Sequence, residues 1–203
     1  MLKTRRTLQS EQTRERIIAT ATRLFIRKGF YATSIADLAR SVKVTKGALY
    51  HHFENKDAIF FAVIETIRKT WKDGVARGVL KSKDALTRLA VLLDNHARLM
   101  AQNETFCLVL NSLMMEMEGV NPAFIITLQE IYVELVRFIE QIIRKGQTAR
   151  QIRSDLDAKL TAFHIVGMLR GTGCSRPIFA RLDVDYLSLI ETLKKVLLSG
   201  LKP

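Results

Sequence analysis

Prolines, cysteines and aromatic residues are all scarce in this sequence. Among its 203 residues there are only three prolines and two cysteines, and 7% of the residues are aromatic. Leu, Ala, Ile, Arg, Lys and Glu dominate instead, and this composition favours helices. The two cysteines, Cys107 and Cys174, show no paired spacing. We therefore expect no disulfide framework and a reducing, cytoplasmic environment.

Signals for membrane insertion and for export are also missing. No uncharged run is longer than residues 105–115, which is far short of the roughly 20 residues that a membrane span needs. Residues 2–16 are rich in polar and charged side chains, which a secretion signal is not. The sequence predicts a cytoplasmic protein, associated with the nucleoid when it is bound to DNA, that has no membrane partner.

Motifs for catalysis and cofactor binding are absent as well. The sequence has no phosphate-cradling glycine loop, no His-Glu-x-x-His and no Gly-x-Ser-x-Gly. The Gly171-Thr172-Gly173 run is too short for a nucleotide fingerprint. His51 and His52 point in different directions on a helix and lack a Cys or carboxylate at a matching position, so we expect no metal site. We predict neither an enzyme nor a bound cofactor.

Acidic residues are too few to balance the basic ones. The 32 Lys and Arg exceed the 20 Asp and Glu, which gives a formal net charge of +12. Residues 1–56 hold 12 basic and four acidic side chains, so about a quarter of the chain carries two thirds of the excess. This balance indicates a polyanionic partner, above all nucleic acid, that docks on the N-terminal part.

Helix signals recur along the chain, and strand signals do not. Apolar residues at positions 17, 18, 21, 24 and 25 repeat at spacings of three and four, and Gly29 ends this first helix. Ser34 with Asp37, and then Thr45, can cap two short helices joined by about four residues. Asn55 caps a longer helix. Two short helices with a helix on each side are the outline of a helix-turn-helix.

Five more helices are predicted behind this module. Four of them have expected caps at Ser82, Asn121-Pro122, Ser154 with Asp157, and Asp183, and one spans about 105–117. The predicted fold class is all-α, with about nine helices. We expect a DNA-binding domain over residues 1–55, in which residues 1–9 form a flexible basic arm. Residues 56–203 should form a helical effector-binding and dimerisation domain.

The most specific motif covers the two short helices. Residues 33–56 read TSIADLARSVKVTKGALYHHFENK, after an Ala-x-x-Leu-Phe-x-x-x-Gly-Phe run at 21–30. Together they closely resemble the DNA-binding signature of TetR-family transcriptional regulators. The resemblance is strong from about residue 13 to 63, and beyond it only the number, lengths and order of the helices agree. It implies a dimer that binds operator DNA and is released by a small effector.

The second short helix needs one buried face and one bare face to read DNA. Leu49 and Phe53, four residues apart, should pin it to the core, and the absent side chain of Gly47 lets the backbone approach DNA. The resemblance implies phosphate contacts for four residues and base readout by others, with Arg40 as an alternative near the turn. The predicted DNA-binding set is Thr33, Ser34, Lys43, Thr45, Lys46, Gly47, Ala48, Tyr50, His51 and Lys56, of which Thr33, Ser34, Tyr50 and Lys56 would bind phosphate.

One position in the turn departs from the family pattern. Family members commonly carry a glycine where this sequence has Lys43. Either Lys43 adopts a left-handed conformation, at a cost on the order of 1 kcal/mol, or the turn is shaped differently. In both cases Lys43 adds a cation close to DNA, and we hypothesise that it contacts a phosphate.

The remaining helices should hold the effector and the partner subunit. A mostly apolar lining indicates a hydrophobic or amphipathic small molecule. The predicted effector-binding set is Phe60, Trp71, His96, Met100, Phe106, Met114, Phe124, Tyr132 and Phe163. We interpret His96 and His164 as satisfied core or pocket histidines rather than metal ligands. Core packing is favoured over an adaptable pocket lining for each of the methionines at 100, 114, 115 and 117. The predicted dimer contacts, which rest partly on the resemblance, are Gly167, Gly171, Leu189, Leu193, Val196 and Leu197.

These observations predict a ligand-responsive transcriptional regulator that represses from a palindromic operator. The alternative is a sequence-indifferent architectural protein, which would share the salt dependence of DNA binding but show little preference among sequences. The helix-turn-helix argues against it. A basic helical enzyme is a third possibility, which the missing catalytic motifs disfavour.

Overall fold

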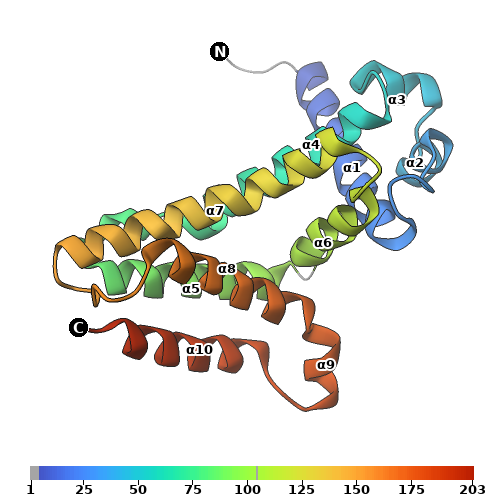
Figure 1. The fold of residues 1–203 in the computed structure, drawn as a ribbon. Coiled ribbons are helices and arrows are strands. Elements are labelled where there is room, and N and C mark those ends of the chain that lie inside the picture. The colour runs from blue at the N-terminus through green and yellow to red at the C-terminus, as the bar shows by residue number, and fades with distance from the viewer. Residues whose placement is uncertain (1–4, 104) are drawn as a thin grey trace. The chain divides into compact units, whose positions relative to one another are not determined.

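The structure is a computed structural model that describes residues 5–103 and 105–203 (Figure 1). Over these residues it contains helices and connecting loops but no strand, which confirms the all-α prediction. The α-helices are α1 (Arg5–Lys28), α2 (Ile35–Val42), α3 (Lys46–His52), α4 (Lys56–Trp71), α5 (Ala85–Gln102), α6 (Thr105–Met117), α7 (Pro122–Thr148), α8 (Ala158–Cys174), α9 (Arg176–Arg181) and α10 (Tyr186–Leu201). A π-helical segment, η1 (Lys72–Ala76), and a 3-10 segment, η2 (Val79–Lys81), follow α4.

The chain folds into two compact units. The first comprises the chain up to Ile67 together with Val109–Ile125, and the second comprises Arg68–Leu108 and Ile126–Pro203. The first unit therefore extends past the expected domain boundary at residue 55 and includes a segment from the C-terminal half of the sequence. Three helices, α4, α6 and α7, contribute residues to both units.

The first unit is built on the apolar stripe of α1. Ile17, Ala21 and Phe25 are completely buried, because their spacing of four places them on one face of the helix. The expected arm over residues 1–9 is wrong for residues 5–9, which already belong to α1. Residues 1–4 lie outside the described part of the chain.

The three caps predicted around the helix-turn-helix are confirmed. The Asp37 amide donates to the Ser34 hydroxyl at 3.0 Å, and the Ser34 amide donates back to the Asp37 carboxylate at 3.2 Å. The Thr45 hydroxyl accepts from the Ala48 amide at 3.0 Å, and Asn55 Oδ1 accepts from the amide at position 58 at 2.8 Å. Such side chains satisfy N–H groups that have no partner inside the helix, so they fix where each helix begins.

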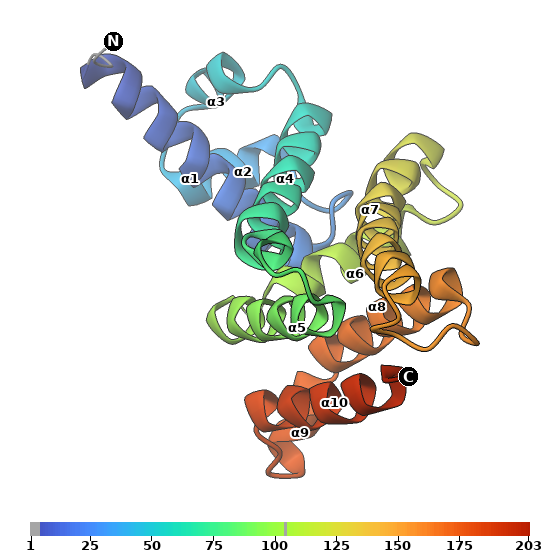
Figure 2. The same ribbon diagram turned by 90° about the vertical axis from the view of Figure 1, so that its left-hand side faces the viewer.

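The second unit is held together around α5. The side-chain amide of Asn95 donates to the carbonyl of Val75 in η1 at 2.9 Å and to that of Arg77 at 3.1 Å. On another side α5 packs against α10, where Lys194 Nζ lies 2.7 Å from the Asp94 carboxylate. Figure 2 shows α9 leading into α10 at the C-terminal end of this unit. None of the described helices is long and apolar enough to cross a membrane.

Several predicted boundaries of the later helices are wrong. Asn121-Pro122 does open α7, but α5 begins after Asp84 rather than Ser82. The last helix begins after Asp185 rather than Asp183. The cap of α8 is Asp157 rather than Ser154. The short helix α9 was not predicted.

Candidate nucleic-acid interface

The predicted division of α3 into a buried and a bare face is confirmed. Leu49 is 0% exposed and Phe53 at the end of the helix is 4% exposed, whereas Tyr50 is 51% exposed. Lys46, Gly47 and His51 are exposed too, and Ala48 is half-buried. An added Cβ at Gly47 would meet only the Thr45 hydroxyl, at 3.9 Å, so this side of the helix is open. The exposed face of α3 thus presents the side chains of Lys46, Tyr50 and His51 around the uncovered backbone of Gly47.

The turn between α2 and α3 has the left-handed conformation that one of the two alternatives predicted. Lys43 is the C-terminal cap of α2 with φ 61° and ψ 50°, and its amide donates to the Arg40 carbonyl at 3.2 Å. The neighbouring Val42 is buried, and its carbonyl accepts from Arg16 Nη2 at 2.7 Å. Arg16 on α1 therefore fixes the turn, a role that sequence reasoning missed because the contact spans 26 residues.

Replacing Lys43 by glycine should make the protein more stable but weaken its grip on DNA. A glycine adopts this conformation without the steric cost that a Cβ brings, so we expect Lys43→Gly to stabilise folding by about 1 kcal/mol. If the lysine contacts a phosphate, the slope of log affinity against log salt should fall by about one per protomer. Thermal unfolding and DNA titrations at several salt concentrations measure both effects. An unchanged affinity and slope would remove Lys43 from the interface.

The loop between α1 and α2 corrects the prediction for Thr33. Its side chain is 0% exposed, and its hydroxyl donates to the Gly29 carbonyl at 2.6 Å. A phosphate contact from this side chain is therefore wrong for the described conformation, because no part of it reaches the surface. Ser34 next to it is exposed, although its hydroxyl already shares hydrogen bonds with Asp37.

Lys56 also has partners inside the protein. Its ammonium donates to the carbonyls of Phe30 at 3.0 Å, Thr33 at 3.2 Å and Tyr31 at 3.4 Å. It lies 4.3 Å from the centre of the Phe30 ring. The predicted phosphate contact of Lys56 stays a prediction, but the side chain also holds the loop, so its removal would not be a clean test of DNA contact.

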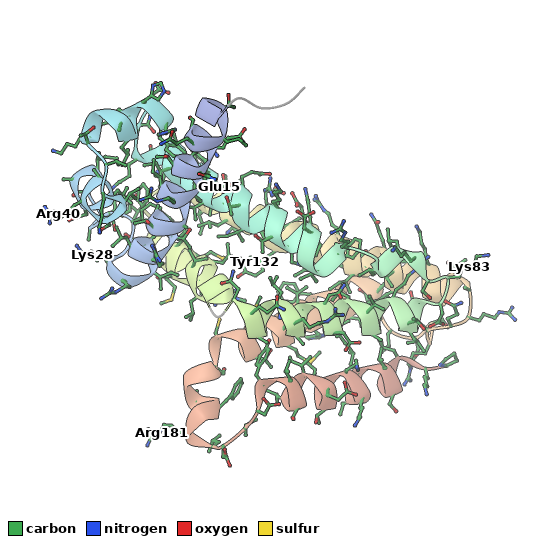
Figure 3. The ribbon with its side chains drawn as sticks, turned by 180° about the vertical axis from the view of Figure 1, so that it is seen from behind. Glu15, Lys28, Arg40, Lys83, Tyr132 and Arg181 are labelled. Carbon is green, nitrogen blue, oxygen red and sulfur yellow. The ribbon has the colours of Figure 1, made fainter. Side chains whose placement is uncertain are left out.

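Positive charge gathers on the surface around α2 and α3. Figure 3 shows the side chains of Lys28 and Arg40 projecting from the first unit, and Lys43 and Lys46 are exposed close by in the sequence. The nearby carboxylate of Asp37 is engaged in the cap of α2, and its hydrogen bonds with the backbone and side chain of Ser34 hold its pKa below its ordinary value. Because these cations are exposed rather than buried, several of them can contact a polyanion at the same time.

The predicted effector residues are divided between the two units. In the first unit Phe60 and Phe124 are buried and stack face to face, 4.1 Å apart with an interplanar angle of 10°, so they form core. In the second unit Trp71, His96 and Met100 are buried. Met114 and Tyr132 are half-buried, Phe163 is 65% exposed, and the side chain of Phe106 lies outside the described part of the structure.

Two of these residues carry a buried polar atom that lacks a hydrogen bond among the described residues. They are Trp71 Nε1 and His96 Nε2. Burial lowers the pKa of His96 to about 4, so its ring is neutral near pH 7. An unpaired buried donor costs free energy, and a bound acceptor can recover it. His164, in contrast, is exposed, so the core interpretation is wrong for that residue.

The predicted dimer residues lie on faces of α8 and α10 that carry exposed apolar side chains. On α8 nothing lies within 4 Å of an added Cβ at Gly167 or Gly171, and Leu160 and Phe163 on the same face are 61% and 65% exposed. On α10 Val196 is 67% exposed, and the other predicted residues, Leu189, Leu193 and Leu197, are half-buried. Phe163 thus groups with the predicted dimer face rather than with a pocket.

Family models match most of the chain. Residues 17–63 match the model described as bacterial regulatory proteins of the tetR family. Residues 85–179 match the model described as a tetracyclin repressor-like C-terminal domain. The first match covers α2 and α3 completely, together with the second half of α1 and the first half of α4.

Individual proteins agree with these matches. The chain is 24% identical over 166 residues to the HTH-type transcriptional repressor DhaR of Mycobacterium sp. (strain GP1), covering 78% of this chain and 79% of that protein. It is 36% identical over 69 residues to the HTH-type transcriptional regulator HbdR of Aromatoleum sp. (strain CIB), covering 34% of this chain but only 30% of that protein. The crystal structure of FadR from Bacillus subtilis in complex with stearoyl-CoA has a TM-score of 0.76 at 20% identity, covering 92% of this chain and 98% of that one.

Proposed function

Because the chain belongs to the TetR family of bacterial regulatory proteins, we propose that it is a repressor that binds a palindromic DNA operator as a dimer and leaves it when a small molecule binds. The single observation that carries the DNA-binding part is the geometry of α3. Its apolar side is fully buried through Leu49, while Lys46, Gly47 and Tyr50 stay open to a groove. The repressor named DhaR is a relative over most of both chains, which supports repression.

Dimerisation is supported by the apolar faces of α8 and α10. An exposed row formed by Leu160, Phe163, Gly167 and Gly171 recurs at helical spacing, and bare glycines allow another helix to approach closely. A seven-residue recognition helix reads few bases on its own. Two copies spaced one turn of DNA apart multiply the specificity, and the two-fold symmetry of a dimer accounts for a palindromic operator.

The effector part rests on the buried polar atoms of the second unit. Trp71 and His96 are buried, and Trp71 Nε1 and His96 Nε2 are unpaired among the described residues. The imidazole is neutral, so it favours a neutral acceptor such as a carbonyl over a free carboxylate. An effector with an apolar body and one carbonyl fits this chemistry. The acyl thioester part of stearoyl-CoA, which FadR of Bacillus subtilis binds, has such a chain and carbonyl, and we propose the acyl thioesters as the effector class here.

The experiment that tests this function measures DNA and effector binding together. DNA duplexes are first selected by the protein from a random pool, and we expect the selected duplex to bind at least 10³-fold tighter than a shuffled one. Stearoyl-CoA is then titrated. Trp71 is the only tryptophan of the chain, so we expect its fluorescence to change over the same concentration range in which the duplex is released.

Two controls separate the parts of the proposal. Free coenzyme A, which lacks the acyl carbonyl, should change neither signal. By linkage, the selected duplex should weaken stearoyl-CoA binding by the factor with which stearoyl-CoA weakens DNA binding. Equal affinity for selected and shuffled duplexes would instead identify an architectural protein. A silent tryptophan with retained DNA selectivity would exclude the acyl-thioester class only.

A further inference from the structure

The loop between α1 and α2 is held by a carboxylate from a distant part of the sequence. Glu116, near the end of α6, accepts from the Phe30 amide through Oε2 at 2.6 Å and from the Tyr31 amide through Oε1 at 2.7 Å. Both oxygens of one carboxylate are therefore used on two successive peptide groups. Successive N–H groups of this kind form a concave binding place for an anion, and hydrogen bonds to a charged acceptor are among the stronger ones in proteins.

Gly29 makes this contact possible. Its φ of +86° is a conformation that favours glycine, and an added Cβ would lie 2.9 Å from Glu116 Oε1. A side chain at this position would therefore meet both backbone strain and the carboxylate. The chain ends α1 with a residue that turns the next two amides towards Glu116 and leaves room for it.

The backbone N–H groups of this loop bind an acidic side chain, and its backbone carbonyls bind a basic one. The N–H groups of Phe30 and Tyr31 face the Glu116 carboxylate, and the carbonyls of Phe30, Tyr31 and Thr33 accept from the Lys56 ammonium. The peptide dipoles thus lie between an anion on α6 and a cation on α4. The Phe30 ring adds packing, since it contacts Phe60 and Phe124 edge to face at 5.4 and 5.5 Å.

The held loop leads directly into the helix-turn-helix. Thr33 is the last loop residue, and Ser34 after it caps α2, the first helix of the module. Because the peptide groups of this loop are already fixed before DNA binds, DNA binding loses less conformational entropy in ordering the loop. All of these residues belong to the first compact unit, which includes the end of α6.

We propose that Glu116 is a positioning residue for DNA binding: its carboxylate fixes the α1–α2 loop and thereby keeps the helix-turn-helix in its DNA-binding arrangement. The inference rests on the proposed DNA-binding function.

The test replaces Glu116 by glutamine and uses Glu118 as the matched control. Glu118 is exposed, lies two residues further along the chain and carries the same charge. Removing an acidic charge near DNA raises affinity by electrostatics alone, so Glu118→Gln should bind the selected duplex equally or slightly more tightly. Glu116→Gln should instead bind it about tenfold more weakly, because the amide group opposes one of the two loop N–H groups. Glu116→Gln should therefore lower the affinity for DNA, whereas Glu118→Gln should leave it unchanged or raise it.

Two further measurements separate positioning from direct contact and from general damage. A positioning residue makes no phosphate contact, so the salt dependence of DNA binding should keep its slope in Glu116→Gln. Native-state amide exchange should speed up at Phe30 and Tyr31 but stay unchanged at Leu49 in α3. If Glu116→Gln binds DNA as tightly as Glu118→Gln, or if exchange accelerates equally at Leu49, the positioning role is wrong. Absence of DNA selectivity in the unmodified protein would instead overturn the proposed function.

Discussion

The double variant Lys46→Ala, Tyr50→Phe should lose on the order of 10³-fold in affinity for the selected duplex while its stability stays close to that of the unmodified protein. Both side chains are exposed on α3, and neither contributes to the core that Leu49 and Phe53 form. A lysine contact to a base and a phenol contact to a phosphate each contribute about 1 kcal/mol or more. A dimer makes each contact twice, so the losses add to at least about 4 kcal/mol.

The controls for this variant use charge and salt. Lys83→Ala removes the same charge from an exposed loop position of the second unit (Figure 3), and it should leave affinity for the duplex nearly unchanged. Fluorescence anisotropy at several salt concentrations gives both affinity and slope, and thermal unfolding checks the fold. If the double variant binds as Lys83→Ala does, α3 is not the recognition helix.

Acid should destabilise the protein through His96, by about 3 kcal/mol between pH 6.5 and pH 4. Burial lowers the pKa of this imidazole from 6.5 to about 4. Well above pH 6.5 the ring is neutral in the folded and in the unfolded chain, so it adds no pH dependence. As the pH falls below 6.5, the unfolded chain binds a proton that the folded chain does not bind. The free energy of unfolding therefore decreases until the folded state is protonated as well.

The variant His96→Leu isolates this effect. It removes the titrating group and keeps an apolar side chain of similar size, so the difference in unfolding free energy between pH 7 and pH 4.5 should shrink by about 2–3 kcal/mol. His51→Gln is the matched control, because His51 is exposed on α3 and should leave the difference unchanged. Urea unfolding at the two pH values measures both. An equal acid sensitivity in His96→Leu and in the unmodified protein would contradict the assignment.

Local sequence signals were sufficient for the helix-turn-helix. Ser34, Thr45 and Asn55 each act on an amide three residues further on, so their capping contacts depend only on residues close in sequence. The buried side of α3 followed from the four-residue spacing of Leu49 and Phe53 in the same way. These features need no knowledge of the rest of the chain.

The predicted first residue of a helix was wrong where two neighbouring polar residues can each cap that helix. Ser82 lies two residues before Asp84, and Asp183 two residues before Asp185, and either residue of each pair can accept from a helix amide. Asp183 instead takes a positive φ of 51° in the turn after α9. Pro177 lies in the first turn of the unpredicted helix α9, a position that proline favours at the start of a helix.

Contacts across long stretches of sequence could not be read from local patterns. Thr33 was assigned to phosphate because the family motif places it beside the N-terminus of α2, but burial is decided by the packing of the loop. The Glu116 contact spans 85 and 86 residues, and an isolated glutamate near a helix end gives no sign of its partner. The positive φ of Gly29 is visible only in the fold, although a glycine after a helix does point to a special turn.

The first compact unit is discontinuous in sequence, and this limits how the protein can be divided or recombined. A fragment that ends at Ile67 would lack Phe124, which stacks on Phe60, and the carboxylate that closes the first loop. A chimeric regulator that joins this first unit to the effector-binding region of another protein must therefore include residues 109–125 as well as residues 1–67. If the two proteins were joined at a single point in the sequence, the transferred first unit would lack residues 109–125, and part of its hydrophobic core would be exposed to water.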